Sequence, residues 1–250
     1  MKRKVNLGVW WDKRARANAR KYIASASWKT EENFDKSGFV DTRQVLADIL
    51  VPKDCVALEI GVGIGRIARH MAKSVGELYG VDVSSEMVER ARERLNGISN
   101  CQVRQNNGSD LSMFPDEKFD FVYSVYVFQH LPREVFRSYL KEIYRVLRPN
   151  GLLKFQIFER TTYLGLVPVF WLRNLRHLHL IFWHDPPDDD PWVARAYSRR
   201  EVLESSQQFE VVKVNNPTGK EGDLWIVCRK PSRNTQLVDA PLVASSSSIE

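Results

Sequence analysis

The chain has 250 residues, 43% of them hydrophobic, and a formal net charge of +6, which is enough for one domain with a full core. It holds no run of about 18 apolar residues, so no membrane span is expected. Its three cysteines lie far apart, which favours reduced thiols in a cytoplasmic protein over disulfides or a zinc site. The basic charge permits nucleic acid, anionic lipid or an acidic ligand as partner, although a solvated surface explains it more simply.

Residues 1–50 are predicted to form a helical N-terminal segment that leads into the core. Thr42 is predicted to cap a helix that reaches Leu50, and Pro52 ends that helix. Four aromatic residues are dense for a segment outside a sheet: Trp10, Trp11, Tyr22 and Trp28. They either cover a ligand site or pack on the core, and the sequence leaves both interpretations open.

From residue 51 on, short apolar strands alternate with helical patterns. The predicted strands are 56–60, 78–82, 101–105, 119–124 and 151–157, and the predicted helices are 65–74, 85–96 and 133–147. Such alternation is typical of an α/β protein with a parallel sheet that helices cover on both faces.

The C-terminal part of the chain carries different signals. A capping box at 198–201 predicts a short helix. Strands at 209–214 and 224–228, joined by a loop with proline and glycines, predict an antiparallel hairpin. From residue 231 the apolar pattern ends, and a disordered tail is expected over 231–250.

The strand at 56–60 contains an acid and runs into glycines at every second position: Glu59, Gly61, Gly63 and Gly65. A strand, a glycine turn and a helix together form a cradle for a nucleotide, because glycine permits tight turns and the helix start offers free N–H groups. A dinucleotide fingerprint would need its third glycine where Arg66 stands. Asp82 ends the next strand, where a carboxylate can accept hydrogen bonds from ribose hydroxyls, and Ser84 and Ser85 are predicted caps of the following helix.

These features resemble motif I and the following motifs of the class I S-adenosylmethionine-dependent methyltransferases. The resemblance is strong over about residues 38–160 and looser over 196–230. It implies S-adenosyl-L-methionine as cofactor and a Rossmann-like seven-stranded sheet of order 3-2-1-4-5-7-6 with strand 7 antiparallel. The expected domains are the helical segment 1–50, the methyltransferase domain 51–230 with a cap insertion at about 160–197, and the tail.

The resemblance also implies which residues bind the cofactor. Asn107 stands where the family usually has an acid that meets the adenine amine, although an ordinary Asn-Gly turn would look the same. The full expected set is Glu59, Gly61, Val62, Gly63, Gly65, Arg66, Asp82, Val83, Met87, Asn107, Gly108 and Ser124.

The expected cap insertion, 160–197, alternates apolar and basic residues. On a helix, one face would carry Trp171, Leu172, Leu175, Leu178 and Phe182. That face either contacts an apolar or amphipathic acceptor, or lies on an anionic membrane surface, or packs on the sheet edge. The Asp-Pro-Pro at 185–187 differs in position from the motif of nucleic-acid amino-methyltransferases, which follows strand 4, so it is read as an exposed turn.

Methyl transfer is an in-line displacement in which alignment supplies much of the rate. A hydroxyl acceptor also gains from a general base, and the candidates are His130, beyond strand 119–124, and Glu159, at the end of strand 151–157. No metal site is expected. The predicted function is methylation of a small molecule, most simply a hydroxyl of a lipid, sugar or secondary-metabolite intermediate. The alternatives are a nucleic-acid or protein methyltransferase, or a non-catalytic cofactor-binding protein. Nucleic acid is the less favoured partner, and the oligomeric state stays open.

Overall fold

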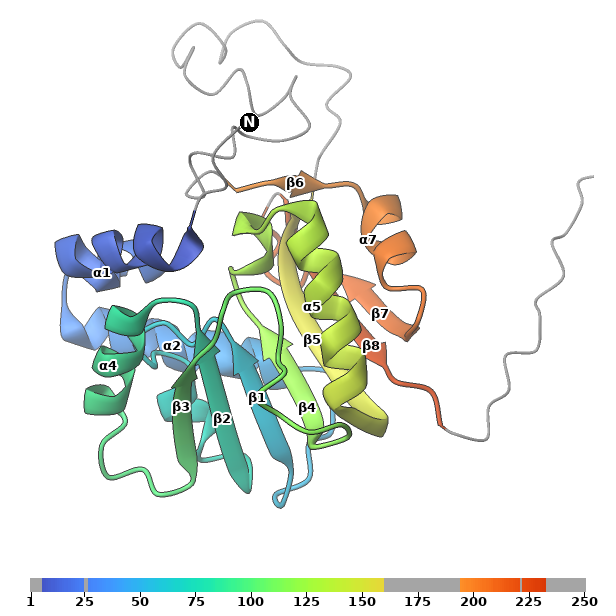
Figure 1. Cartoon of the computed structure of the whole chain (residues 1–250), viewed down its shortest axis with the longest axis horizontal. Helices are drawn as coiled ribbons and strands as arrows, with labels where there is room; N and C mark the ends of the chain where they lie inside the picture. The colour runs from blue at the N-terminus through green and yellow to red at the C-terminus, as the bar shows by residue number, and fades with distance from the viewer. Residues whose placement is uncertain (1–5, 25–26, 160–193, 221, 233–250) are drawn as a thin grey trace, which may run out of the picture.

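One mixed sheet with helices on both faces organises the molecule (Figure 1). The computed structural model describes residues 6–24, 27–159, 194–220 and 222–232. Its strands are β1 Val56–Ile60, β2 Glu77–Asp82, β3 Cys101–Gln105, β4 Phe119–Ser124, β5 Leu147–Glu159, β6 Ala196–Tyr197, β7 Glu210–Asn215 and β8 Asp223–Arg229. Its helices are α1 Leu7–Ile23, α2 Glu31–Leu46, α3 Ala68–Met71, α4 Ser85–Arg94, the 3-10 helix η1 Phe128–His130, α5 Arg133–Val146 and α7 Arg199–Ser205.

The sheet has the strand order β3-β2-β1-β4-β5-β8-β7. The first five strands are parallel, and β8 runs antiparallel to both β5 and β7. The two-residue strand β6 pairs with the end of β5 and lies off this path. Once β6 is set aside, the order is the expected 3-2-1-4-5-7-6 with an antiparallel last strand, so the predicted fold class is confirmed.

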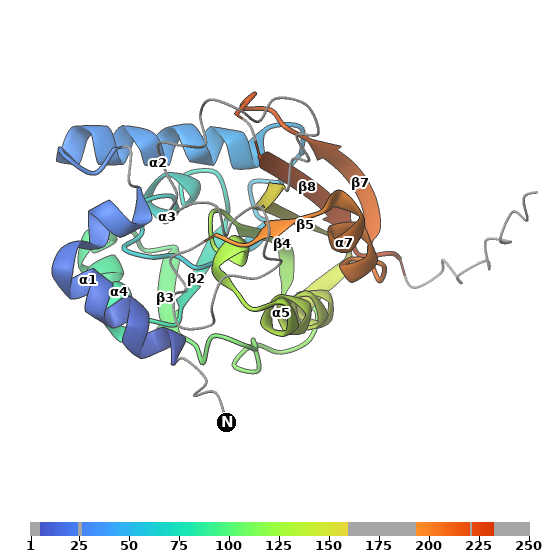
Figure 2. The ribbon, with the colours of Figure 1, turned by 90° about the horizontal axis from the view of Figure 1, so that it is seen from above.

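Two apolar layers hold the helices on the sheet. Leu58, Phe155 and the buried stripe of α5 form one cluster, to which α7 adds Val202. Ala57 and Phe121 face the opposite way and pack against α2, α3 and α4. Figure 2 shows these two layers from above, with α2 and α3 on one side of the sheet and α5 and α7 on the other. Because neighbouring strand residues point to opposite faces, such strands are apolar on both sides.

Several predicted boundaries needed correction. Thr42 caps no helix: Thr30 caps α2 by accepting from the backbone N–H of Asn33 at 3.1 Å, while the Thr42 hydroxyl donates to the Gly38 carbonyl at 2.8 Å inside α2. Helix α2 ends at Leu46, before the predicted helix end at Leu50. The predicted helix 65–74 is α-helical only over the short α3, and β5 extends beyond the predicted 151–157 at both ends.

Other local predictions are confirmed. Ser198 and Glu201 form the capping box of α7, and β7 and β8 form the antiparallel hairpin. Of the expected cap insertion, residues 160–193 lie outside the described residues, as does the tail from 233 on, so the interpretations given for them stay predictions. Within the described ranges, no helix is both long and apolar enough to cross a membrane.

Candidate ligand-binding site

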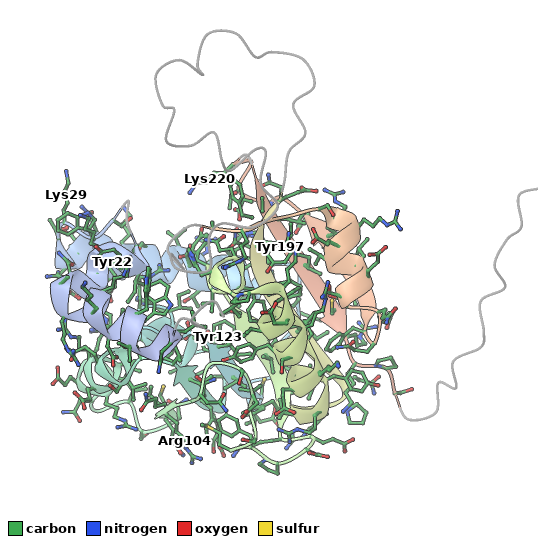
Figure 3. All side chains as sticks on the ribbon, turned by 45° about the horizontal axis from the view of Figure 1, so that its top comes forward. Tyr22, Lys29, Arg104, Tyr123, Tyr197 and Lys220 are labelled. Atoms are coloured by element: carbon green, nitrogen blue, oxygen red, sulfur yellow. The ribbon has the colours of Figure 1, made fainter. Side chains whose placement is uncertain are left out.

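A cavity of about 690 Å³ lies where the parallel strands end, between the sheet and helices α1 and α2. Ligand sites of open α/β sheets occur at this edge. Tyr22 of α1 and Lys220 of the β7–β8 loop both line the cavity and lie near the upper edge of the sheet in Figure 3. The predicted site residues that line it are Glu59, Gly61, Val62, Gly63, Arg66, Asp82, Val83, Met87, Gly108 and His130.

The glycine turn after β1 forms the floor of the cavity. Gly61 and Gly63 have φ values of 77° and 53°, in the left-handed region that favours glycine. A Cβ atom on Gly63 would lie 2.8 Å from the Cδ1 atom of Ile23 in α1, and one on Gly61 would lie 2.2 Å from Val127. Both glycines are thus required by backbone conformation and by close packing. Gly65 does not line the cavity. A Cβ added to Gly65 would lie 3.0 Å from Leu95, so this glycine allows Leu95 to pack closely against the turn.

Asp82 joins the end of β2 to the glycine turn. Its Oδ2 atom accepts a hydrogen bond from the Gly63 backbone at 2.9 Å, and its Oδ1 atom accepts one from the Ser84 backbone at 2.9 Å. Burial raises the pKa of Asp82 to about 6, against which these backbone hydrogen bonds act. The carboxylate is therefore charged at neutral pH, and its partly exposed oxygens can accept further hydrogen bonds from ligand hydroxyls.

Glu59 and Arg66 lie in the wall of the cavity. Glu59 is 3% exposed and accepts a hydrogen bond from the Tyr123 hydroxyl at 2.9 Å, and burial raises the pKa of Glu59 to about 8. Arg66 forms a 2.7 Å ion pair with Asp41 of α2, and it donates to the Ser37 hydroxyl at 3.2 Å. Arg66 therefore links the glycine turn to α2. Its buried Nε atom has no hydrogen-bond partner among the described residues.

The far end of the cavity carries Val83, Met87 and Gly108, of which the last two come from α4 and the loop after β3. A Cβ on Gly108 would approach Val83 to 2.8 Å, and Gly108 has a φ of 80°, so this position favours glycine. The structure places Asn107 in a turn beside the cavity. Its side-chain oxygen accepts from the backbones of Ser109 and Asp110, as in an ordinary turn, and it does not line the cavity.

Asn106, one residue earlier, lines the cavity instead and donates to the Tyr139 hydroxyl at 2.7 Å. The sequence analysis named only Asn107, from its place relative to the family motif. Ser124 is fully buried, donates to the Ile60 carbonyl at 3.0 Å and joins β4 to β1 without lining the cavity.

The two candidate bases lie in different surroundings. His130 ends η1, lines the cavity and meets Trp11 of α1 edge to face, with ring centroids 5.8 Å apart. Glu159 does not line the cavity, and its carboxylate forms an ion pair with Arg199 at 3.2 Å. The structure therefore brings only His130 to the site.

Trp11 and Tyr22 of α1 line the cavity, and Trp11 also packs against the buried cluster that contains Phe34 and Met87. The sequence analysis missed the lining residues Lys36 and Asp41 of α2, and Tyr126 after β4. No local signal marks them, because each reaches the cavity through packing between distant elements. In the part of the chain that the structure describes, no group of His, Cys, Asp or Glu side chains is arranged to hold a metal ion.

Comparison with known proteins shows which family the central part of the chain matches. Residues 57–151 match a family described as a methyltransferase domain. The chain is 31% identical over 124 residues to a phosphoethanolamine N-methyltransferase of Plasmodium falciparum, which covers 49% of this chain and 46% of that protein. It is 31% identical over 137 residues to a 2-methyl-6-phytyl-1,4-hydroquinone methyltransferase of Synechocystis, which covers 54% of this chain and 38% of that protein.

Among solved structures, the fold is similar to phosphoethanolamine N-methyltransferase 1 of Haemonchus contortus in complex with phosphoethanolamine and S-adenosylhomocysteine. The TM-score is 0.65 at 15% identity, covering 91% of this chain and 49% of that one. The chain thus spans less than half the length of these relatives. The glycine turn, Asp82 and the lining residue Gly108 fit an adenosine-bearing cofactor, and S-adenosylmethionine is the cofactor of the methyltransferases that the chain resembles.

Proposed function

Because residues 57–151 form a class I S-adenosylmethionine-dependent methyltransferase domain, we propose that the chain methylates a hydroxyl oxygen of a small molecule. The acceptor is an apolar or amphipathic compound such as a lipid, sugar or secondary-metabolite intermediate. The observation that carries this proposal is that one cavity contains the glycine turn, Asp82 and His130. A cofactor cradle and a titratable group thus face the same enclosed space.

The cofactor would be held by the turn from Gly61 to Gly63, by Asp82 at the ribose and by Val83, Met87 and Gly108 at the adenine. When bound, S-adenosylmethionine supplies an electrophilic methyl group on a positively charged sulfur. Helix α1 covers the cavity with Trp11 and Tyr22, and this cover excludes water from the reacting groups. Much of the rate then comes from holding the acceptor in line.

His130 is the proposed general base. The imidazole nitrogen of a neutral histidine can take the proton of an acceptor hydroxyl. Trp11 contacts one side of its ring, and the loop from β4 carries it to the cavity. Glu159 is not proposed for this role, since its carboxylate is paired with Arg199 outside the cavity.

The relatives bear on the acceptor atom. One is named for N-methylation of phosphoethanolamine and another for a hydroquinone, so both nitrogen and oxygen acceptors are tested. The narrow cavity beneath α1 favours a small acceptor over the nucleic-acid and protein alternatives. The non-catalytic alternative predicts cofactor binding without transfer.

The experiment is transfer of a labelled methyl group from S-adenosylmethionine to a panel of hydroxyl and amine acceptors that includes hydroquinones and phosphoethanolamine. The expected product is an O-methyl compound identified by mass spectrometry, and the control is the Asp82→Ala variant. Products labelled only on nitrogen would overturn the hydroxyl assignment. Calorimetric binding of the cofactor with no transfer to any acceptor would favour the non-catalytic alternative.

A further inference from the structure

Tyr126 has an unfavourable backbone conformation at the wall of the cavity. It follows β4 by two residues, lines the cavity and has a φ of 60°. The left-handed region is uncommon for any residue except glycine, and a bulky side chain there costs on the order of 1–3 kcal/mol unless the surroundings enforce it. Glycine or asparagine would adopt this turn at lower cost. A tyrosine here therefore indicates that its side chain has a role that offsets the cost of the backbone conformation.

A buried side chain holds this backbone in place. The Tyr126 N–H donates to the Oε1 atom of Gln156 on β5 at 3.2 Å, and the Gln156 amide donates in turn to the Ile157 carbonyl at 2.9 Å. Gln156 is 2% exposed, in a strand that is otherwise mostly apolar. A buried amide is tolerated when it is hydrogen-bonded. Gln156 thus stabilises one particular turn after β4, in which the next residue, Val127, packs on Gly61.

The Tyr126 hydroxyl donates to no acceptor among the residues that the structure describes. Burial, and then the carboxylates of Asp41 and Asp223, raise the pKa of Tyr126 to about 12, so the hydroxyl keeps its proton at neutral pH. Asp41 lies on α2 and Asp223 at the start of β8. In the described ranges the hydroxyl forms no hydrogen bond, although its ring packs with the apolar layer beneath α2. A free donor at a cavity wall is suited to binding a ligand atom.

We propose that Tyr126 is an acceptor-binding residue whose hydroxyl donates a hydrogen bond to an oxygen atom of the methyl acceptor. That oxygen neighbours the atom that is methylated, because a hydrogen bond donated to the reacting atom itself would reduce its nucleophilicity. Tyr126 and His130 share the loop after β4 and both line the cavity, so one acceptor molecule can meet both. The acceptor class is therefore a molecule with two neighbouring polar groups, one reacting and one an oxygen that accepts. This inference rests on the proposed function.

The test uses hydroxyl acceptor pairs that differ by one neighbouring hydroxyl group: catechol against phenol, and 4-methylcatechol against 4-methylphenol. A site that donates to an oxygen discriminates against the analogue that lacks it. For a pair that the wild-type protein methylates, we expect kcat/KM to favour the oxygen-rich member by about tenfold or more. Tyr126→Phe keeps the ring and the backbone and removes only the hydroxyl, so this preference should fall to within about twofold, mainly through KM.

The control variant is Tyr144→Phe, which removes a phenol hydroxyl from α5 at a residue that does not line the cavity. It should keep the preference of the wild type. Cofactor affinity by calorimetry and the melting temperature should be unchanged in both variants. Tyr126→Gly, whose backbone adopts the same φ without strain, should also fold, and it should also lose the preference.

The outcomes separate the two proposals. If the wild type methylates one of these acceptors and Tyr126→Phe keeps the preference, the role of Tyr126 is wrong and the proposed function stands. Weaker cofactor binding by a folded Tyr126→Phe would likewise overturn the inference, because it would assign the hydroxyl to the cofactor. If the wild type methylates neither member of any pair, nor any member of the wider panel, the proposed function and this inference both fail.

Discussion

The carboxylate of Asp12 on α1 accepts a 2.5 Å hydrogen bond from the hydroxyl of Ser84, the residue that caps α4. The same carboxylate accepts from the Ser85 hydroxyl at 3.2 Å and from the Glu86 backbone at 3.1 Å. The backbone of Ser84 donates at the same time to Asp82 at 2.9 Å. The helix that covers the cavity is therefore docked on the start of α4, beside the carboxylate expected to meet the ribose.

Asp12→Ala removes these three hydrogen bonds. Loss of a capping carboxylate costs about 0.5–2 kcal/mol, so we expect a fall of that size in the free energy of unfolding, with weaker cofactor binding because α1 is released. Denaturant unfolding and calorimetry measure the two effects. The control is Arg16→Ala, which removes a more exposed 3.4 Å ion pair with Glu86 between the same helices and should cost less than about 1 kcal/mol. Equal effects of the two variants would show that Asp12 has no special part in docking α1.

Asp82→Ala should weaken S-adenosylmethionine binding by about 1.5–3 kcal/mol, the range for hydrogen bonds to a charged group. Binding should also weaken as the pH falls through about 6, where Asp82 takes up a proton and loses acceptor capacity. Calorimetric titration at pH 5, 6 and 7 measures both effects. Circular dichroism of the variant checks its fold, because Asp82 also holds the backbones of Gly63 and Ser84. Unchanged affinity in a folded variant would exclude the ribose role.

Gly63→Val should abolish cofactor binding. The turn requires a φ of 53°, and a Cβ there would lie 2.8 Å from Ile23. The measurement is thermal stabilisation by S-adenosylmethionine. Gly97→Val is a matched control, since Gly97 also has a positive φ, of 86°, but an added Cβ meets nothing within 4 Å. It should lose stability and keep the cofactor response. A Gly63→Val protein that the cofactor still stabilises would make this turn purely structural.

Glu59 should make the protein less stable as the pH rises. Burial raises its pKa to about 8 from an ordinary value of 4.5, so the folded state holds a proton that the unfolded state releases. The resulting stabilisation is complete below pH 4.5 and is lost as the pH rises toward 8. Glu59→Gln should remove this part of the pH dependence while keeping the hydrogen bond from Tyr123. Denaturant unfolding of both proteins from pH 5 to 8 provides the comparison, and parallel curves would contradict the expectation.

His130→Ala should lower turnover by about 10²–10⁴-fold and leave cofactor affinity nearly intact, if the imidazole takes a proton from a hydroxyl acceptor. Glu159→Gln should have little effect, because Glu159 pairs with Arg199 outside the cavity. Rates over pH 6 to 9 and calorimetry give the two readouts. A His130→Ala protein that turns over near the wild-type rate across this range would leave alignment as the main source of catalysis.

Some features could be predicted from the sequence because they depend on neighbouring residues. Strands β1, β3 and β4 have the predicted bounds, since short apolar runs between turn residues are local signals. The glycine turn and the Ser84 cap were also predictable from residue types alone. The strand order, in contrast, came from the resemblance to a family, since periodicity says nothing about which strands pair.

The tertiary structure decided which polar side chains reach the cavity. Asn106 lines it and Asn107 does not, because Asn107 engages its own turn while Asn106 is held by Tyr139 of α5. Glu159 was a plausible base until its pairing with Arg199 was known. Tyr126 lines the cavity where its backbone N–H donates to the side chain of Gln156 on β5, 30 residues away in the sequence. Local sequence determines turns, caps and strands through short-range sterics and hydrogen bonds, whereas the direction of a side chain depends on packing partners that only the folded chain brings together.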